Sequence, residues 1–183
     1  MTTARIGLVS DSHGRFSCLE QMVDQAPDVC CWIHGGDYCN DAEDLAAYAA
    51  VPVYAVLGNN DYLTDMNVPE RRIVKAAGLT IAVIHGSQWY GEKRLRKLEE
   101  WGHSAGADLV VFGHTHCQYK LERDGFVIVN PRQYRPPQRQ ERRDLRHRHG
   151  RRWPADGYPI LSPIKFSDII FDKRWDNVYN VLR

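Results

Sequence analysis

The chain has 183 residues, of which 43% are hydrophobic and 26% are charged, and its formal net charge is +1. This length is enough to bury a full core, and the composition is ordinary for a soluble globular protein. No apolar run approaches the roughly 20 residues that span a membrane, and the N-terminus has no signal-peptide layout, so we expect no membrane partner. The five cysteines show no C-x-x-C spacing, which favours reduced thiols and a cytoplasmic protein.

The first half of the chain alternates strand and helix patterns. Short apolar runs predict buried strands at residues 5–10, 29–34 and 53–57. Helices are predicted between them, at residues 17–25 and 42–50. This alternation is typical of a parallel α/β sheet with right-handed crossovers.

The second half has a more antiparallel pattern. Two hairpins are predicted, one from residues 72–75 and 79–84 and one from residues 118–123 and 126–129. Between the hairpins we predict an amphipathic helix at residues 92–101 and a buried strand at residues 109–112. The sequence therefore predicts an α/β fold in which two sheets pack face to face with helices outside.

Polar residues follow five of the predicted strands where each strand ends. The clusters are Asp11-Ser12-His13, Gly36-Asp37, Gly58-Asn59-Asn60-Asp61, His85-Gly86 and Gly113-His114-Thr115-His116. Ligands of α/β sheets bind beyond the carboxyl ends of the strands, so these loops can converge on one cleft. Asp11 and His13 are two residues apart, as are His114 and His116. In an extended segment such residues point to the same side, so we expect each pair to grip one ion.

The candidate ligands are carboxylates, imidazoles and amide oxygens, with no thiolate among them. This set indicates Mn²⁺, Fe, Ni²⁺ or Zn²⁺ rather than a structural thiolate zinc site. There are too many candidates for one four-coordinate ion, and two ions that share a carboxylate suit in-line phosphoryl displacement. Simpler interpretations stay open, since Asp11-Ser12 can cap a helix and Asn59-Asn60 can form a turn. We expect His34 in the core or behind the ligands.

The ordered clusters resemble the calcineurin-like metallophosphoesterase family, in its small single-domain bacterial and archaeal phosphodiesterase branch, over about residues 5–131. The resemblance implies a four-layer αββα sandwich of two mixed sheets with outer helices. It also implies two divalent metal ions, with Mn²⁺ as the first candidate. The ions would activate a bridging hydroxide that hydrolyses a small phosphate ester such as a nucleotide. One metal would take Asp11, His13 and His116 and the other Asn59, His85 and His114, with Asp37 bridging.

One position departs from the family. Many members carry a histidine after the Gly-Asn pair, where this chain has Asn60, which cannot act as a general acid. We therefore expect substrates with good leaving groups, or an acid supplied by water or another residue. We assign catalytic roles to Asn60, which can donate to the phosphoryl group, to Asp61, which can orient a histidine, and to His85.

Other functions stay open beside the enzyme. Some relatives of this fold have lost metal ligands and serve as scaffolds, although this sequence keeps all four candidate histidines. An arginine-rich C-terminal segment favours nucleic-acid binding, which can coexist with hydrolysis. A homo-oligomer is also compatible with the sequence.

The C-terminal segment, residues 132–183, differs from the core at residues 1–131. The core carries 11 basic and 17 acidic side chains, whereas the segment carries 13 basic and 6 acidic ones. In the family Asn-Pro is usually followed by Gly-Ser and shortly by Pro-Arg, and permitted codons for residues 132–139, read one base out of frame, give that pattern. We therefore put forward a one-base frame slip after Pro131, with no regular strand over residues 132–152 and a late strand near residues 167–172. The alternative is a true basic tail that attracts a polyanion.

Overall fold

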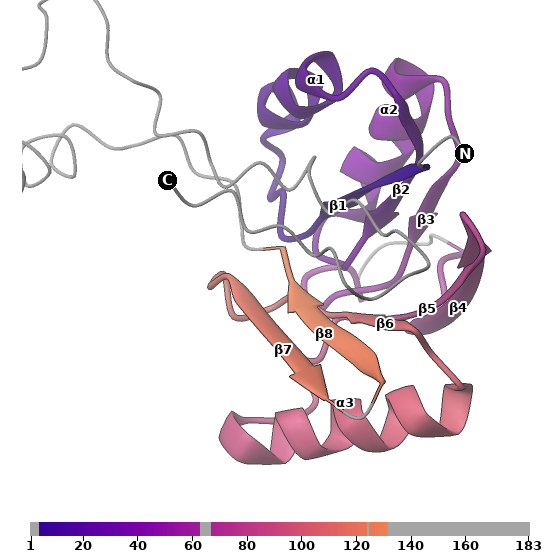
Figure 1. Cartoon of the computed structure of the whole chain (residues 1–183). Coiled ribbons are helices and arrows are strands. Elements are labelled where there is room, and N and C mark those ends of the chain that lie inside the picture. Colours follow the sequence, from indigo (N-terminus) through magenta and orange to yellow (C-terminus); the bar gives the residue numbers. More distant parts are fainter. Residues whose placement is uncertain (1–3, 63–66, 124, 132–183) are drawn as a thin grey trace, which may run out of the picture.

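The computed structural model describes residues 4–62, 67–123 and 125–131. Its elements in chain order are β1 (Arg5–Val9), α1 (Phe16–Gln25), β2 (Val29–His34), α2 (Cys39–Ala49), β3 (Val53–Ala55), β4 (Arg71–Ala76), β5 (Leu79–Ile84), α3 (Gly91–Ala105), β6 (Leu109–Val111), β7 (Tyr119–Arg123) and β8 (Phe126–Asn130) (Figure 1). The arginine-rich segment 132–183, with the strand predicted near residues 167–172, lies outside the described residues.

The strands form two sheets. The first has the order β1-β2-β3 and both of its pairs are parallel. The second has the order β4-β5-β6-β8-β7, with two central parallel pairs and an antiparallel hairpin at each edge. The prediction of two mixed sheets is therefore wrong for the first sheet as described. Helices α1 and α2 connect its strands. Each helical crossover brings the chain back to the same edge of the sheet, so successive strands run parallel.

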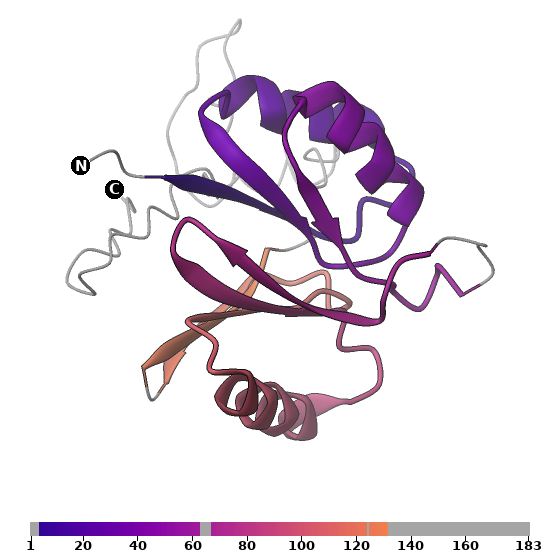
Figure 2. The ribbon, with the colours of Figure 1, turned by 90° about the vertical axis from the view of Figure 1, so that its right-hand side faces the viewer.

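The two sheets lie face to face, with α1 and α2 outside the first sheet and α3 outside the second (Figures 1 and 2). The core between the sheets combines side chains of both, such as Ile33 from β2 and Val111 from β6. Successive side chains of a strand point to opposite faces. In β5, for example, Ile81 belongs to the core between the sheets, whereas Ala82 belongs to the cluster that contains Leu98 of α3.

The predicted elements agree with the observed ones to within a few residues. Helix α2 begins at Cys39 rather than at residue 42, and α3 is longer at both ends than the predicted 92–101. The β4–β5 turn consists of Ala77 and Gly78, whose φ angles of 50° and 77° match a type I′ turn. Among the described residues, no helix combines the length and the apolar character that crossing a bilayer requires.

The loops after the strands meet where the two sheets join, and glycines permit this close approach. A Cβ at Gly113 would lie only 2.1 Å from Ser10 Oγ. A Cβ at Gly58 would lie 2.1 Å from Asp37 Oδ1. No larger residue fits at either position without moving a loop. Gly113 therefore lets loops of the two sheets come together, and Gly58 lets two loops of the first sheet do so.

Candidate metal centre

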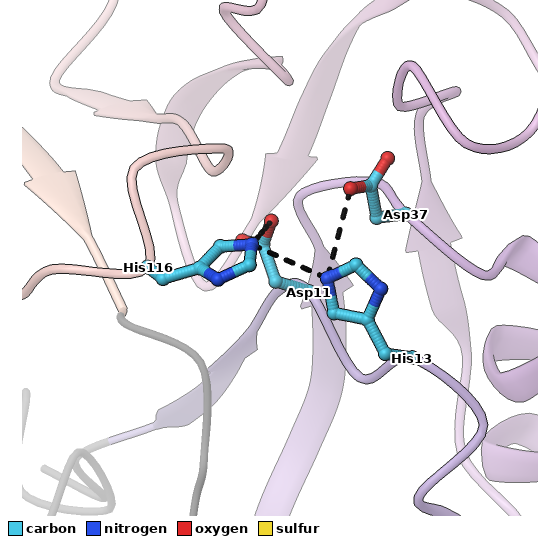
Figure 3. Close-up of side chains that lie close together, drawn as sticks. All are labelled: Asp11, His13, Asp37 and His116. Atoms are coloured by element: carbon cyan, nitrogen blue, oxygen red, sulfur yellow. Dashed lines mark hydrogen bonds and ion pairs between the residues drawn. The ribbon is translucent and has the colours of Figure 1, made fainter.

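Four predicted ligands form a compact group that joins loops of both sheets. Asp11, His13, Asp37 and His116 each place a ligand atom within 4.8 Å of the others (Figure 3). His13 Nε2 lies 3.2 Å from His116 Nε2, and His116 Nε2 lies 3.3 Å from Asp11 Oδ1. Asp37 Oδ2 is 3.8 Å from His13 Nε2. The carboxylates are buried and the imidazoles are half-buried, so the group opens toward solvent on its histidine side.

The other three predicted ligands lie on the opposite side of Asp37. His85 Nε2 is 3.4 Å from Asp37 Oδ1 and 3.1 Å from Asn59 Oδ1. Asn59 Oδ1 also lies 2.9 Å from His114 Nδ1. All seven predicted ligands are therefore linked by short contacts, and the carboxylate of Asp37 lies next to an imidazole of each group.

The hydrogen bonds of His85 show that this second group suits a cation. Its Nδ1 lies 2.8 Å from the carbonyl oxygen of Gly35, which can only accept, so Nδ1 carries a proton. Its Nε2 lies on the other side of the ring, close to the oxygens of Asn59 and Asp37. A ring nitrogen, an amide oxygen and a carboxylate oxygen that lie this close together can ligate one cation. This donor set fits a divalent metal ion.

The local backbone of the ligands differs from our prediction. Asp11, His13, His114 and His116 have φ angles of 55°, 50°, 67° and 55°, so they adopt left-handed rather than extended conformations. The expectation of an extended backbone is therefore wrong for both pairs, although Asp11 and His13 do lie in one group. His114 and His116 instead contact different groups. Left-handed backbone at non-glycine residues costs roughly 1–2 kcal/mol each, and such strain gathers at functional sites.

Hydrogen bonds orient both carboxylates. Asp11 accepts from Ser10 Oγ at 2.6 Å and from the backbone N–H of His114 at 3.1 Å. Asp37 accepts from the backbone N–H of Asn60 at 3.0 Å and from Asn60 Nδ2 at 2.6 Å. Here the Asn60 amide orients Asp37, whereas we predicted that it donates to a phosphoryl group.

Asp61 holds the loop that carries Asp37. Its carboxylate accepts from the backbone N–H groups of Asp37, Cys39 and Gly58 at 3.0, 2.9 and 2.8 Å. Burial acts to raise the pKa of Asp61, but hydrogen bonds from backbone N–H groups, chiefly those of Cys39 and Gly58, and from the Cys39 thiol outweigh it and hold the pKa below the usual range. These contacts differ from the predicted role of orienting a histidine. This role could have been inferred from the sequence, because Asp61 stands three residues after Gly58 in a loop. Aspartate side chains in loops commonly accept hydrogen bonds from backbone N–H groups close by.

His34 connects two ligand loops from behind, as expected. Its Nδ1 accepts from the N–H of Gly36 at 3.2 Å, so Nε2 donates to Ser12 Oγ, also at 3.2 Å. Ser12 in turn donates to the carbonyl of Asp37 at 3.4 Å. Burial lowers the pKa of His34, only partly opposed by the charge of Asp41 and of other nearby carboxylates, so the neutral ring is favoured.

Two supporting residues were missed by sequence reasoning. Asn130, the last residue of β8, donates to the carbonyl of Gly113 at 2.7 Å and to Thr115 Oγ1 at 3.0 Å, within the loop of His114 and His116. Arg94 of α3 donates from Nε to the carbonyl of Gly86, the residue after His85, at 2.9 Å. Both residues lie outside the five clusters, so only their position in the fold reveals them.

His114 is tuned toward the form that binds metal. Burial lowers its pKa, and the neighbouring charges of His85 and Arg94 lower it further, while Asp11 and Asp37 act in the opposite direction. The net effect favours the neutral imidazole, which is the form that coordinates a metal ion.

The chain resembles known proteins over the part that holds this site. Residues 4–145 match the profile of the calcineurin-like phosphoesterase superfamily domain. A protein of Methanocaldococcus jannaschii named a probable metallophosphoesterase is 33% identical over 133 residues, which cover 70% of this chain and 67% of that protein. The crystal structure of a predicted phosphoesterase from Streptococcus pneumoniae has a TM-score of 0.61 at 24% identity, covering 73% of this chain and 74% of that one. The structure of an archaeal phosphodiesterase has a TM-score of 0.56 at 25% identity, covering 70% and 84%.

Proposed function

The chain belongs to the calcineurin-like phosphoesterase superfamily and is a metallophosphoesterase, a hydrolase of phosphoric ester bonds, and from this premise we propose that it cleaves phosphodiesters with two divalent metal ions. The contacts of His85 carry the two-metal part of the proposal. Its buried Nε2 lies near the oxygens of Asn59 and Asp37, and this donor set, separate from Asp11, His13 and His116, supports a second ion.

In this proposal each group of side chains holds one ion. Asp11, His13 and His116 bind the first, Asn59, His85 and His114 bind the second, and Asp37 serves both. When bound, the two cations supply hydroxide from water near neutral pH and neutralise charge that develops on the phosphoryl oxygens. The mixed oxygen and nitrogen donors favour Mn²⁺, with Ni²⁺, Fe and Zn²⁺ as further candidates.

The remaining residues of the site position these ligands. Asn60 and Asp61 fix the orientation of Asp37, one by bonding its carboxylate and the other by bonding its backbone N–H. Because the Asn60 amide cannot act as a general acid, the leaving group must depart as a stable anion or take its proton from water or from another residue. This supports phosphodiesters with acidic leaving groups as the preferred substrates. The similarity to an archaeal phosphodiesterase supports the same choice.

The test is reconstitution of the full chain after chelation. Mn²⁺, Ni²⁺, Fe²⁺ or Zn²⁺ is added back, metal content is measured, and hydrolysis of bis-p-nitrophenyl phosphate is compared with that of p-nitrophenyl phosphate. We expect no hydrolysis without metal, two bound ions per chain, and faster cleavage of the diester. Two bound ions without turnover of either ester would instead favour the scaffold function, and faster cleavage of the monoester would overturn the phosphodiesterase assignment.

A further inference from the structure

An exposed tyrosine borders the metal centre without belonging to its ligands. Tyr38 directly follows Asp37, and 43% of its surface is exposed. Its ring centroid lies 5.1 Å from that of His13, and the ring planes meet at 63°, which is an edge contact. Tyr38 therefore presents an aromatic surface next to a ligand of the first metal group.

The backbone of Tyr38 is held in an unfavourable conformation. Its φ and ψ are 67° and 63°, and the preceding Asp37 also has a positive φ, of 65°. A bulky residue in this left-handed region is a genuine outlier, and glycine or asparagine would adopt the conformation at lower cost. Tyr38 also makes no side-chain hydrogen bond as the N-cap of α2. Neither backbone geometry, capping nor burial therefore explains a tyrosine here.

One side of the ring is supported by the loop that carries His13. A Cβ on Gly14 would lie 3.6 Å from Tyr38 Cε1 and 3.8 Å from Cδ1, so Gly14 faces the ring with room for about one methyl group between them. The N–H of Gly14 donates to Asp41 Oδ2 at 2.9 Å, which ties this loop to α2. The ring is thus positioned before any substrate arrives, and the entropy cost of ordering it on binding is small.

We propose that Tyr38 is a specificity residue that stacks on the nucleobase of a nucleoside phosphodiester substrate. This inference rests on the proposed phosphodiesterase function and names its substrate class. Stacking of a base on an aromatic side chain tolerates any base and strengthens binding about 5- to 30-fold or more. The base would lie on Tyr38 while the phosphodiester group lies at the metal ligands next to it.

Kinetics on two esters with the same leaving group test the proposal. Thymidine 5′-(p-nitrophenyl phosphate) carries a base, whereas methyl p-nitrophenyl phosphate does not. Tyr38→Asn removes the ring and suits the left-handed backbone, with Tyr38→Gly as a second such variant, and Tyr38→Phe keeps the ring. Tyr48→Ala is the matched control, since it removes a tyrosine that is 45% exposed and lies ten residues along α2, about 15 Å away.

We expect Tyr38→Asn and Tyr38→Gly to raise KM for the thymidine ester about 5- to 30-fold at nearly constant kcat. In Tyr38→Asn and Tyr38→Gly, KM for the methyl ester should change by less than about twofold, because this ester has no base. In Tyr38→Phe and Tyr48→Ala, KM for both esters should also change by less than about twofold, because no base contact is lost. An equal rise in KM for both esters would show that the ring contacts the nitrophenyl group instead, and no rise for either would show that it contacts no substrate. Either result overturns the proposal.

Calorimetry separates this inference from the proposed function. Binding of AMP and of inorganic phosphate to Mn²⁺-loaded protein is measured in the same variants, without any hydrolysis. AMP should bind wild type more tightly than phosphate, and Tyr38→Asn should weaken AMP binding about 5- to 30-fold while leaving phosphate binding unchanged. Failure of the proposed function appears as wild type that hydrolyses neither ester. Failure of this inference appears as equal effects on AMP and phosphate, or as no effect on AMP.

Discussion

Asp37 is the residue that, in the proposed two-metal site, serves both ions. One of its carboxylate oxygens faces His13 and the other faces His85. We predict that Asp37→Asn reduces turnover below detection and lowers metal content toward one ion or fewer, because a neutral amide replaces the shared anionic ligand. His116→Ala is the matched comparison, since it removes one ligand of one group and should leave measurable activity. Normal turnover and two bound ions in Asp37→Asn would contradict the shared-ligand assignment.

His34 makes stability depend on pH at the residue scale. Burial lowers its folded-state pKa below the unfolded value, so the unfolded chain binds the proton more readily. The stability from the neutral ring is therefore complete above the unfolded pKa, roughly 6.5, and is lost as pH falls below it. We predict a loss of at most about 1.4 kcal/mol per pH unit on acidification, and a smaller loss in His34→Gln. Urea unfolding of both proteins from pH 7.5 to 5, with metal chelated, measures the difference, and parallel pH profiles would contradict this role.

At the scale of one element, helix α2 has left-handed residues at both of its ends. Tyr38 precedes it with a φ of 67°, and Ala50 ends it with a φ of 53°, where its N–H bonds the carbonyl of Ala46. Glycine is the preferred residue at such a C-terminal position. We predict that Ala50→Gly stabilises the protein by about 1 kcal/mol, whereas Ala49→Gly, one residue earlier inside the helix, destabilises it by about as much. Urea unfolding midpoints of both variants test this prediction. If both midpoints shift in the same direction, the left-handed conformation of Ala50 is not what reduces stability at this end of the helix.

At the scale of the whole molecule, every candidate ligand lies between Asp11 and His116, well before residues 132–183. We propose, as the sequence suggests, that the reading frame slips after Pro131, and the gene tests this directly. The codons for residues 132–139 should give Gly-Ser and Pro-Arg in the neighbouring frame. Codons that cannot do so would exclude the slip.

A functional basic tail makes a different prediction for the same segment. Because its lysines and arginines would displace counterions from nucleic acid, affinity should fall steeply as salt rises. Fluorescence anisotropy with single-stranded DNA at 50 and 200 mM salt, on the full chain and on a chain ending at Pro131, measures this. If a frame slip produced the segment, we expect both chains to bind DNA equally weakly. A salt-sensitive affinity that is lost in the chain ending at Pro131 would contradict the slip.

The sequence by itself determined the elements and the candidate ligands. An apolar run such as Val29–His34 predicts a strand, because both faces of a buried strand contact the core. A polar cluster such as Gly113 to His116 predicts a ligand site, because the loops after parallel strands bind the ligands of α/β sheets. Both signals are local, so they can be read without a fold. The chain also shows its family through the order of these clusters.

Only the tertiary structure decided how the ligands are arranged and supported. His114 and His116 are two residues apart, yet their left-handed backbone sends them to different groups, which strand periodicity cannot anticipate. Asn130 and Arg94 reach the ligand loops from β8 and α3, and Tyr38 meets His13 across 25 residues of sequence. These contacts join segments that are distant along the chain, and their geometry depends on sheet packing and on the close approach of loops at Gly58 and Gly113. Packing of that kind leaves no periodic signal in a sequence, because it is a property of two surfaces rather than of one segment.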